Sequence, residues 1–198
     1  MKIIAGVDEV GRGPLAGPVS VCIVSCEINI YKKLKNSRTL PAHGKDSKKL
    51  KPLEREKFQK VLENLTKEKK ISYSITHIGN KIIDSRGILF AINKAIFSNI
   101  KKLKLNPKNT EVLLDGNLKA PQEFKNQKTI IKGDEKEKII AWASILAKVS
   151  RDTLMSRLSK KFPKYGFELH KGYGTEKHIK MIKKNGQTPI HRKTFLKS

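Results

Sequence analysis

The chain has 198 residues, which is enough for one domain with a core that needs neither a disulfide nor a structural metal. It contains 43 Lys plus Arg against 18 Asp plus Glu, a formal charge of +25. This positive field suits a polyanion and makes nucleic acid the leading partner, although a lysine-biased proteome would explain part of the excess. No apolar stretch reaches membrane-spanning length and no signal peptide precedes Asp8, so we expect a cytoplasmic protein with no membrane partner.

The first half of the chain is predicted to contain three strands and one helix. Strands over residues 2–9 and 18–28 are joined as an antiparallel hairpin by the Gly- and Pro-rich turn 11–17. Cys22 and Cys26 would lie about 13 Å apart on one face of the second strand, too far for a disulfide, and are expected to be buried thiols in a reducing compartment.

The polar, basic segment 29–51 is expected to be a surface loop. After it we expect a helix from Pro52, with a core face of Phe58, Val61, Leu62 and Leu65, and a strand over 71–75.

The second half alternates helices with strands. The pattern predicts a helix over 80–103, weakened in the middle by Gly87, strands at 110–115 and 128–132, a long helix over 135–160 with Trp142 in the core, and a short helix at 175–184. These elements indicate an α/β fold, a mixed five-stranded sheet flanked by helices. We expect a single domain, residues 1–198, with 163–198 as a basic extension packed on it.

Acidic residues follow two of the predicted strands. Asp8 and Glu9 end the first strand, before the glycine-flanked Arg12, and Asp115 ends the strand at 110–115. Parallel strands that end in acids at one sheet edge would bring those acids together, where α/β folds bind ligands. The alternatives are a solvated strand end at Asp8 and Glu9 and an ordinary Asp-Gly turn at Asp115.

Asp134 has a competing structural interpretation. With Glu137 three residues later and a long helix beyond, it fits a capping-box pattern, whereas a position beside the other acids would make it a ligand. Carboxylates without Cys or His at ligand spacing select Mg²⁺ or Mn²⁺ over zinc. In a basic protein, such a cluster suits two-metal phosphodiester hydrolysis.

Several other side chains are candidates for contacts with a nucleic acid. Lys48 in the long loop, and Lys148 and Arg151 one turn apart on the long helix, could flank a phosphate backbone, with a solvated helix face as the alternative. Tyr173, between two glycines, suits stacking on a sugar or base, with plain packing as the alternative. The histidines at 170, 178 and 191 are interpreted as surface or substrate-proximal residues, and not as metal ligands.

Together these segments closely resemble the ribonuclease HII family, the type 2 ribonucleases H. The resemblance runs in family order through residues 8–18, 46–50, 114–116, 132–134, 140–152, 170–175 and 189–192. It implies a ribonuclease H-like fold, hydrolysis of the RNA strand of RNA/DNA hybrids, and incision 5′ of single ribonucleotides in duplex DNA that leaves 3′-hydroxyl and 5′-phosphate ends. The type 3 enzymes have threonine in place of Arg12 and an extra N-terminal domain, which favours type 2.

The resemblance also implies roles for individual residues. It assigns the metals to Asp8, Glu9, Asp115 and Asp134, contact with the ribonucleotide 2′-hydroxyl to Gly11, Arg12 and Gly13, and packing at the RNA-to-DNA junction to Tyr173. Ser144, Lys48, Lys148 and Arg151 complete the expected substrate-binding set, and the enzyme is expected to be a monomer. Trp142 and Gly87 depart from the family pattern, which puts local packing in question more than activity. A basic protein that coats nucleic acid without cleaving it, and a related metal nuclease for branched DNA, stay open as alternatives.

Overall fold

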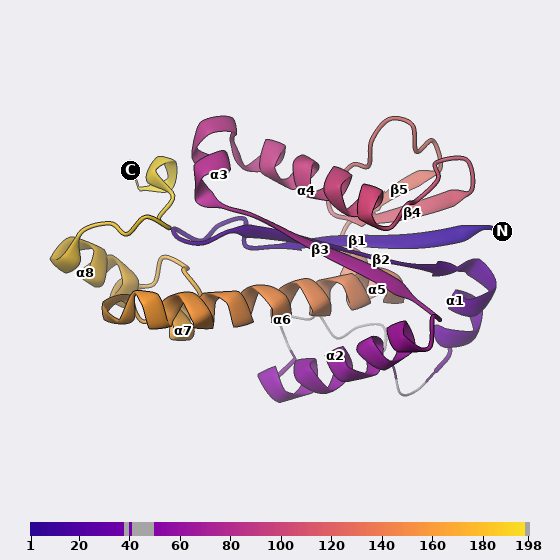
Figure 1. The fold of residues 1–198 in the computed structure, drawn as a ribbon, viewed down its shortest axis with the longest axis horizontal. Coiled ribbons are helices and arrows are strands. Elements are labelled where there is room, and N and C mark those ends of the chain that lie inside the picture. Colours follow the sequence, from indigo (N-terminus) through magenta and orange to yellow (C-terminus); the bar gives the residue numbers. More distant parts are fainter. Residues whose placement is uncertain (38–39, 41–49, 197–198) are drawn as a thin grey trace.

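One mixed sheet organises the molecule, with helices on both faces (Figure 1). The computed structural model describes residues 1–37, 40 and 50–196. The sheet has five strands, as predicted, and their order, β3-β2-β1-β4-β5, comes from the structure. The helices α3 (Asn80–Arg86) and α4 (Ile88–Lys102) lie on one face, and α6 (Lys138–Lys161) and α2 (Pro52–Lys67) lie on the other (Figure 1). The α/β class expected from the element order is confirmed.

The two central strands have different neighbours. β1 (Ile3–Val10) pairs antiparallel with β2 (Val19–Glu27), which confirms the predicted hairpin, and β2 pairs antiparallel with β3 (Ser72–Ile78). On its other side β1 pairs in parallel with β4 (Thr110–Asp115), and β4 pairs in parallel with β5 (Gln127–Ile130). The parallel pair β1 and β4 ends in acidic residues at one edge of the sheet.

The loop predicted over 29–51 is wrong at its start, where helix α1 (Ile28–Leu34) follows β2 directly. Its buried Tyr31 packs edge-on against Trp142, and its hydroxyl donates to Glu137 at 3.2 Å. A helix of seven residues with Tyr31 as its buried residue is too short to reveal itself in the sequence, because helical periodicity needs several turns. The predicted helix at Pro52 is confirmed as α2 (Pro52–Lys67), where Leu62 is fully buried.

The single helix expected over 80–103 is two helices, α3 (Asn80–Arg86) and α4 (Ile88–Lys102). Gly87 separates them with φ of +84°, a backbone conformation outside the α-helical region that glycine adopts readily. The glycine that weakens the predicted helix therefore ends one helix and begins another.

The predicted helix over 135–160 is also divided, into α5 (Gly133–Lys136) and α6 (Lys138–Lys161). Beyond α6 the chain forms short 3₁₀ turns, η1 (Pro163–Tyr165) and η2 (Lys193–Phe195), with α7 (Phe167–His170) and α8 (Glu176–Asn185) between them. α8 confirms the short helix expected at 175–184. α7, α8 and η2 gather at the end of the molecule opposite the N-terminus (Figure 1).

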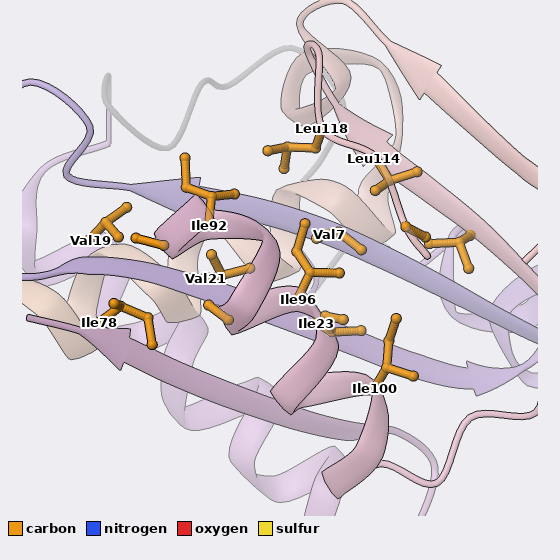
Figure 2. Close-up of a cluster of buried hydrophobic side chains, with 14 of the residues drawn as sticks. Val7, Val19, Val21, Ile23, Ile78, Ile92, Ile96, Ile100, Leu114 and Leu118 are labelled. Atoms are coloured by element: carbon orange, nitrogen blue, oxygen red, sulfur yellow. The ribbon is translucent and has the colours of Figure 1, made fainter. Parts of the chain in front are cut away.

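Two apolar layers hold the helices to the sheet. In the first, α4 places Ile92, Ile96 and Ile100 over β-strand side chains that include Val7, Val21 and Leu114 (Figure 2). In the second, α6 packs Ile139, Ala143 and the fully buried Trp142 against the opposite face, which confirms the core position of Trp142. Cys22 and Cys26 are buried free thiols in this second layer, as predicted.

Among the residues described, no helix has the length and apolar character needed to cross a membrane.

Candidate active site

The parallel pairing of β1 with β4 places two of the predicted acids side by side. The register pairs Val7 with Leu114, so that Asp8 and Asp115 are the next residues along each strand. β1 is apolar from Ile3 to Val7 and β4 from Val112 to Leu114, because these stretches run through the core, and in each strand an acid follows directly. β4 ends at its acid, whereas β1 continues beside β2 to Val10. Asp8 is buried and Asp115 is partly buried.

Glu9 joins this pair although it follows Asp8 directly. β4 ends at Asp115 and turns at Gly116, so Glu9 lies one residue beyond the last residue of β4. Carboxylate oxygens of Asp8, Glu9 and Asp115 all lie within 4.8 Å of one another. These three residues are called the acid cluster below. All of its donors are oxygens, the ligands that Mg²⁺ and Mn²⁺ prefer, so the cluster fits such an ion.

The pKa of Asp8 shows that the carboxylates of the acid cluster repel one another. Burial raises the pKa of Asp8 well above its ordinary value, and the charges of Glu9, Asp115 and Asp134 raise it further. A hydrogen bond from Ser144 on α6 acts in the opposite direction and lowers the pKa. The backbone N–H of Glu9 also donates to Asp8 Oδ1, at 2.7 Å. A bound cation would offset this repulsion.

Asp134 lies near the acid cluster but is not one of the three acids whose oxygens fall within 4.8 Å of one another. The capping interpretation is wrong, because the residue before α6 is Glu137 and Asp134 lies buried within α5. The preceding Gly133 donates its backbone N–H to Asp115 Oδ1 at 2.6 Å. The turn from β5 into α5 therefore orients Asp115 and brings Asp134 close to Asp8.

The Gly11–Gly13 segment follows the acid cluster directly. The side chain of Arg12, which is 43% exposed, forms an ion pair with Glu9 at 3.1 Å. Gly11 has φ of +89°, and a Cβ there would lie 2.3 Å from Arg151 Nε, so the fold requires glycine at this position. At Gly13 a Cβ would have no described atom within 4 Å. Packing within the described chain thus leaves room for a side chain at Gly13.

Tyr173, from the far end of the chain, lies next to this segment. The carbonyl of Gly172 accepts hydrogen bonds from the backbone N–H groups of Leu15 and Ala16, at 2.8 and 3.3 Å. A Cβ on Gly172 would lie 2.3 Å from the Ala16 carbonyl oxygen, so a side chain would push the two loops apart. The Tyr173 ring itself is 40% exposed. The loop that carries Tyr173 is thus joined to the residues just after Gly11–Gly13. Arg151 lies against both segments, beside Gly11 and with its guanidinium 5.8 Å from the centre of the Tyr173 ring.

Arg151 departs from its predicted role in phosphate binding. It is fully buried, and its guanidinium donates to the backbone carbonyls of Ala16, Pro18 and Lys171. The correct interpretation is that Arg151 joins α6 to the two loops, and neither the phosphate contact nor the solvated helix face holds. Sequence spacing gives the helix face but does not show that loops cover that face.

Of the two lysines predicted to contact phosphates, the structure describes only Lys148. Lys148 forms an ion pair with Asp152 at 3.0 Å and lines a cavity of about 540 Å³ together with Arg55 and Lys171. Lys48 lies outside the described residues.

His178 and His191 are buried, so the surface alternative of the histidine prediction is wrong for these two residues. The N–H of Thr188 donates to His191 Nδ1 at 2.7 Å, so the proton of His191 is on Nε2. This Nε2–H donates to His178 Nε2 at 3.1 Å, and His178 Nδ1–H donates to the carbonyl of Tyr173 at 2.9 Å. The two neutral rings thus form a chain of hydrogen bonds from the backbone of Thr188 to the backbone of Tyr173. The irregular spacing of the histidines along the sequence, at positions 170, 178 and 191, gives no sign of this pairing.

This histidine pair predicts a loss of stability in mild acid. Burial, followed by the neighbouring His178, lowers the pKa of His191 to about 4, whereas an unfolded histidine titrates near 6.5. The unfolded chain therefore binds a proton that the native state excludes, and the free energy of unfolding falls as the pH drops from about 6.5 to 4. We expect a loss of about 2 kcal/mol between pH 7 and pH 5.

Urea titrations at the two pH values, at fixed ionic strength, measure this loss. His191→Asn should reduce the dependence of the unfolding free energy on pH. The raised pKa of Asp8 makes the protein more stable as the pH falls, and it opposes the histidine effect in both proteins. Two other titratable side chains face the pair: the ring of His170 stacks on His178 at 4.3 Å, and the ring of Tyr165 lies 5.4 Å from that of His191. An unchanged pH dependence in His191→Asn would contradict the prediction.

The fold and the acid cluster together define a class of nucleic-acid hydrolase. Ribonuclease H2 from Pyrococcus horikoshii OT3 is similar in structure, with a TM-score of 0.70 and 26% identity over 97% of this chain and 93% of that chain. The structure of Bst-RNase HIII in complex with Mn²⁺ shares the fold at 17% identity and a TM-score of 0.67, over 93% of this chain and 63% of that one. The protein thus has the ribonuclease H-like fold.

Sequence comparison gives the family. The family model described as Ribonuclease HII matches residues 5–198. Ribonuclease HII of Clostridium beijerinckii is 46% identical over 98% of this chain and 68% of that protein, and the one of Caldicellulosiruptor bescii is 45% identical over 100% and 88%. The chain belongs to the ribonuclease HII family. It is therefore a hydrolase and an endoribonuclease, and the resemblance seen in the sequence is confirmed.

Proposed function

We propose that this endonuclease, which hydrolyses the RNA strand of RNA/DNA hybrids, also incises duplex DNA on the 5′ side of a single ribonucleotide. The products would carry 3′-hydroxyl and 5′-phosphate ends. One observation supports this proposal most strongly. The backbone hydrogen bonds from Leu15 and Ala16 to Gly172 bring Tyr173 beside the Gly11–Gly13 segment, next to the acid cluster. A nuclease for any duplex would not need such a second surface beside its acids.

The acid cluster would hold Mg²⁺ or Mn²⁺, with Asp134 close enough to take part. Bound there, the metal would activate the attacking water and stabilise the leaving 3′-oxygen. The chain's own residues orient the carboxylates. The N–H of Glu9 and the hydroxyl of Ser144 hold Asp8, and the N–H of Gly133 holds Asp115. Ser144 therefore acts on substrate through Asp8 in this proposal.

Recognition of the ribose is assigned to Gly11, Arg12 and Gly13. A protein distinguishes RNA from DNA through the 2′-hydroxyl, which both donates and accepts hydrogen bonds. The open space at Gly13 lets a sugar approach the backbone closely. Tyr173, with its exposed ring, would stack on the deoxyribose that follows and select a sugar without the extra oxygen.

Phosphates on either side of the cut would contact basic residues. Lys148, beside Arg55 and Lys171, is one candidate, and Lys48 is another. The formal charge of +25 supports this part of the proposal, because a polyanion releases counterions on binding. We further propose that the enzyme acts as a monomer in the cytoplasm, with residues 163–198 packed on one catalytic domain.

Gly13→Val tests this assignment. We expect the variant to fold normally, since space is open at this position, and to cleave a duplex with one ribonucleotide about 100-fold more slowly because the side chain blocks the sugar. The measurement is single-turnover cleavage of a labelled duplex with Mg²⁺ or Mn²⁺, beside the thermal melting temperature. Tyr173→Ala should lose activity on the same substrate while its metal dependence stays that of the unsubstituted enzyme.

An all-DNA duplex and an all-DNA junction serve as control substrates for this experiment. The all-DNA duplex of the same sequence should stay intact. Mapping of the product ends of the ribonucleotide duplex gives the side of incision. Cleavage of the all-DNA duplex at the rate of the ribonucleotide duplex would contradict the proposal, and so would full activity of Gly13→Val. Cutting of all-DNA junctions would instead favour the branched-DNA nuclease, and binding without cleavage would favour the coating protein.

A further inference from the structure

A second buried arginine, Arg192, lies behind the Gly11–Gly13 segment. It is fully buried, and its guanidinium donates three hydrogen bonds to backbone carbonyls. Nη2 donates to Gly11 O and Nη1 to Arg12 O, both at 2.7 Å, and Nε donates to Gly17 O at 3.0 Å. The backbone N–H of Arg192 also donates to Leu15 O, at 2.8 Å. This one residue therefore bonds to four residues of the turn between β1 and β2.

These contacts determine the orientation of two peptide planes. In a trans peptide the N–H points away from the preceding carbonyl, and the described peptide bonds are trans. Because the carbonyls of Gly11 and Arg12 point toward the guanidinium, the N–H groups of Arg12 and Gly13 point away from it. Both Arg12 and Gly13 are exposed residues, so these two donors face outward. Two adjacent outward donors suit a ribose 2′-oxygen.

The same C-terminal segment also positions Tyr173. His191 precedes Arg192, and through His178 it connects to the Tyr173 carbonyl. An isolated bridge pairs Ala16 with His191, and the N–H of Gly17 donates to Ile190 O at 2.9 Å. Residues 188–192 therefore contact the Gly11–Gly13 segment directly, through Arg192, and are connected to Tyr173 through His178.

We propose that Arg192 is a positioning residue for ribose recognition: its guanidinium holds the Gly11 and Arg12 carbonyls so that the Arg12 and Gly13 N–H groups face the substrate. This inference rests on the proposed function of the Gly11–Gly13 segment. Lysine would keep the charge but cannot reproduce the planar set of donors that reaches three carbonyls. Burial lowers the pKa of Arg192 to about 10, so the side chain stays charged at neutral pH.

The test is binding preference in a background that does not cleave. In Asp115→Asn with Mg²⁺, fluorescence anisotropy gives the Kd of a duplex with one ribonucleotide and of the same duplex in all-DNA form. We expect Arg192→Lys to reduce the preference for the ribonucleotide duplex about tenfold. Affinity for the all-DNA duplex should stay within about twofold, because phosphate contacts carry no information about the sugar.

Tyr165→Phe is the matched control. The Tyr165 hydroxyl shares its one proton between the carbonyls of Asn185 and Gly186, at 3.2 and 2.7 Å, so its loss loosens the same extension at those residues. The phenylalanine ring keeps the contact with His191. We expect this variant to melt at a lower temperature but to keep the ribonucleotide preference. An equal loss of preference in Tyr165→Phe would overturn the inference, because it would mean that any loosening of the extension has this effect.

A second variant covers the case in which Arg192→Lys does not fold. Asp84 accepts hydrogen bonds from the N–H groups of Lys193 and Thr194, and Asp84→Ala releases this segment without removing the guanidinium. It should lower the preference two- to threefold. Full preference in a folded Arg192→Lys, or in Asp84→Ala when Arg192→Lys is unfolded, would overturn the inference. If the parent Asp115→Asn protein shows no preference, the proposed ribose recognition itself fails.

Discussion

Asp8→Asn and Asp115→Asn are each expected to lower the rate of cleavage by about 1000-fold or more. Each substitution removes a negative charge from the acid cluster but keeps an oxygen acceptor of the same size. The N–H of Glu9 or of Gly133 can therefore still donate to the new side chain. Single-turnover cleavage of a labelled RNA/DNA hybrid at saturating enzyme measures the loss without a contribution from weaker binding.

Although Asp8→Asn is expected to lose activity, its free energy of unfolding should rise. Burial and the charges of Glu9 and Asp115 raise the pKa of Asp8, so the charged group is held at a cost in the metal-free protein. We expect the free energy of unfolding without metal to rise by about 1 kcal/mol. Added Mg²⁺ should then raise the melting temperature of the unsubstituted protein more than that of the variant.

Glu111→Gln is the control, because Glu111 lies earlier on the same strand as Asp115 and opposite Ile4, away from the acid cluster. It should keep the activity of the unsubstituted enzyme. Asp134→Asn should lose activity to a smaller degree, since Asp134 is not one of the three clustered acids. An Asp8→Asn enzyme that melts at a clearly lower temperature in metal-free buffer would show that Asp8 supports the fold and would contradict the assigned role.

Gly6→Ala is expected to have the largest effect on stability. A Cβ at Gly6 would lie 2.5 Å from both the carbonyl carbon and the carbonyl oxygen of Ile139, at the start of α6. Backbone atoms cannot rotate away as a side chain can, so α6 would have to move off β1. We expect a loss of about 3 kcal/mol in the free energy of unfolding, measured by urea denaturation. Activity should fall as well, because Ser144 on α6 would shift from Asp8.

Gly79→Ala is the matched control for the change from glycine to alanine. Gly79 precedes α3 with φ of −73°, and a Cβ there would meet no described atom within 4 Å. Its stability should stay within about 1 kcal/mol of that of the unsubstituted protein. If Gly6→Ala were as stable as Gly79→Ala, the close packing of α6 on β1 would not be a requirement of the fold.

The acid cluster could be predicted in large part from the sequence. Apolar runs that end at Asp8 and at Asp115 indicate strands that leave the core at those residues, and the helices between strands favour parallel pairing. Asp134 shows the limit of such reasoning. Its spacing from Glu137 fits a cap, but the chain forms the separate short helix α5 before α6 begins. Local spacing does not decide where one helix ends and the next begins.

The charged residues in and next to the C-terminal extension are harder to interpret from the sequence. Arg151 on α6 and Arg192 in the extension are buried, and His178 and His191 share a hydrogen bond inside the extension. The segment Pro189 to Arg192 is part of the family resemblance, which marks it as important without saying what Arg192 contacts. Burial of a charged residue has no signature in its immediate neighbours, because the loops that cover it come from elsewhere in the chain.

The sequence by itself determined the strands, most of the helices and which acids lie at strand ends, because these depend on patterns a few residues long. Only the tertiary structure decided that Glu9 reaches the same cluster as Asp8, and that the carbonyls of Gly11 and Arg12 bind Arg192 from the other end of the chain. Such contacts depend on where β4 stops and on how the extension folds back. The free energy that selects them comes from burying and hydrogen-bonding groups that are far apart in sequence, and no local pattern records it.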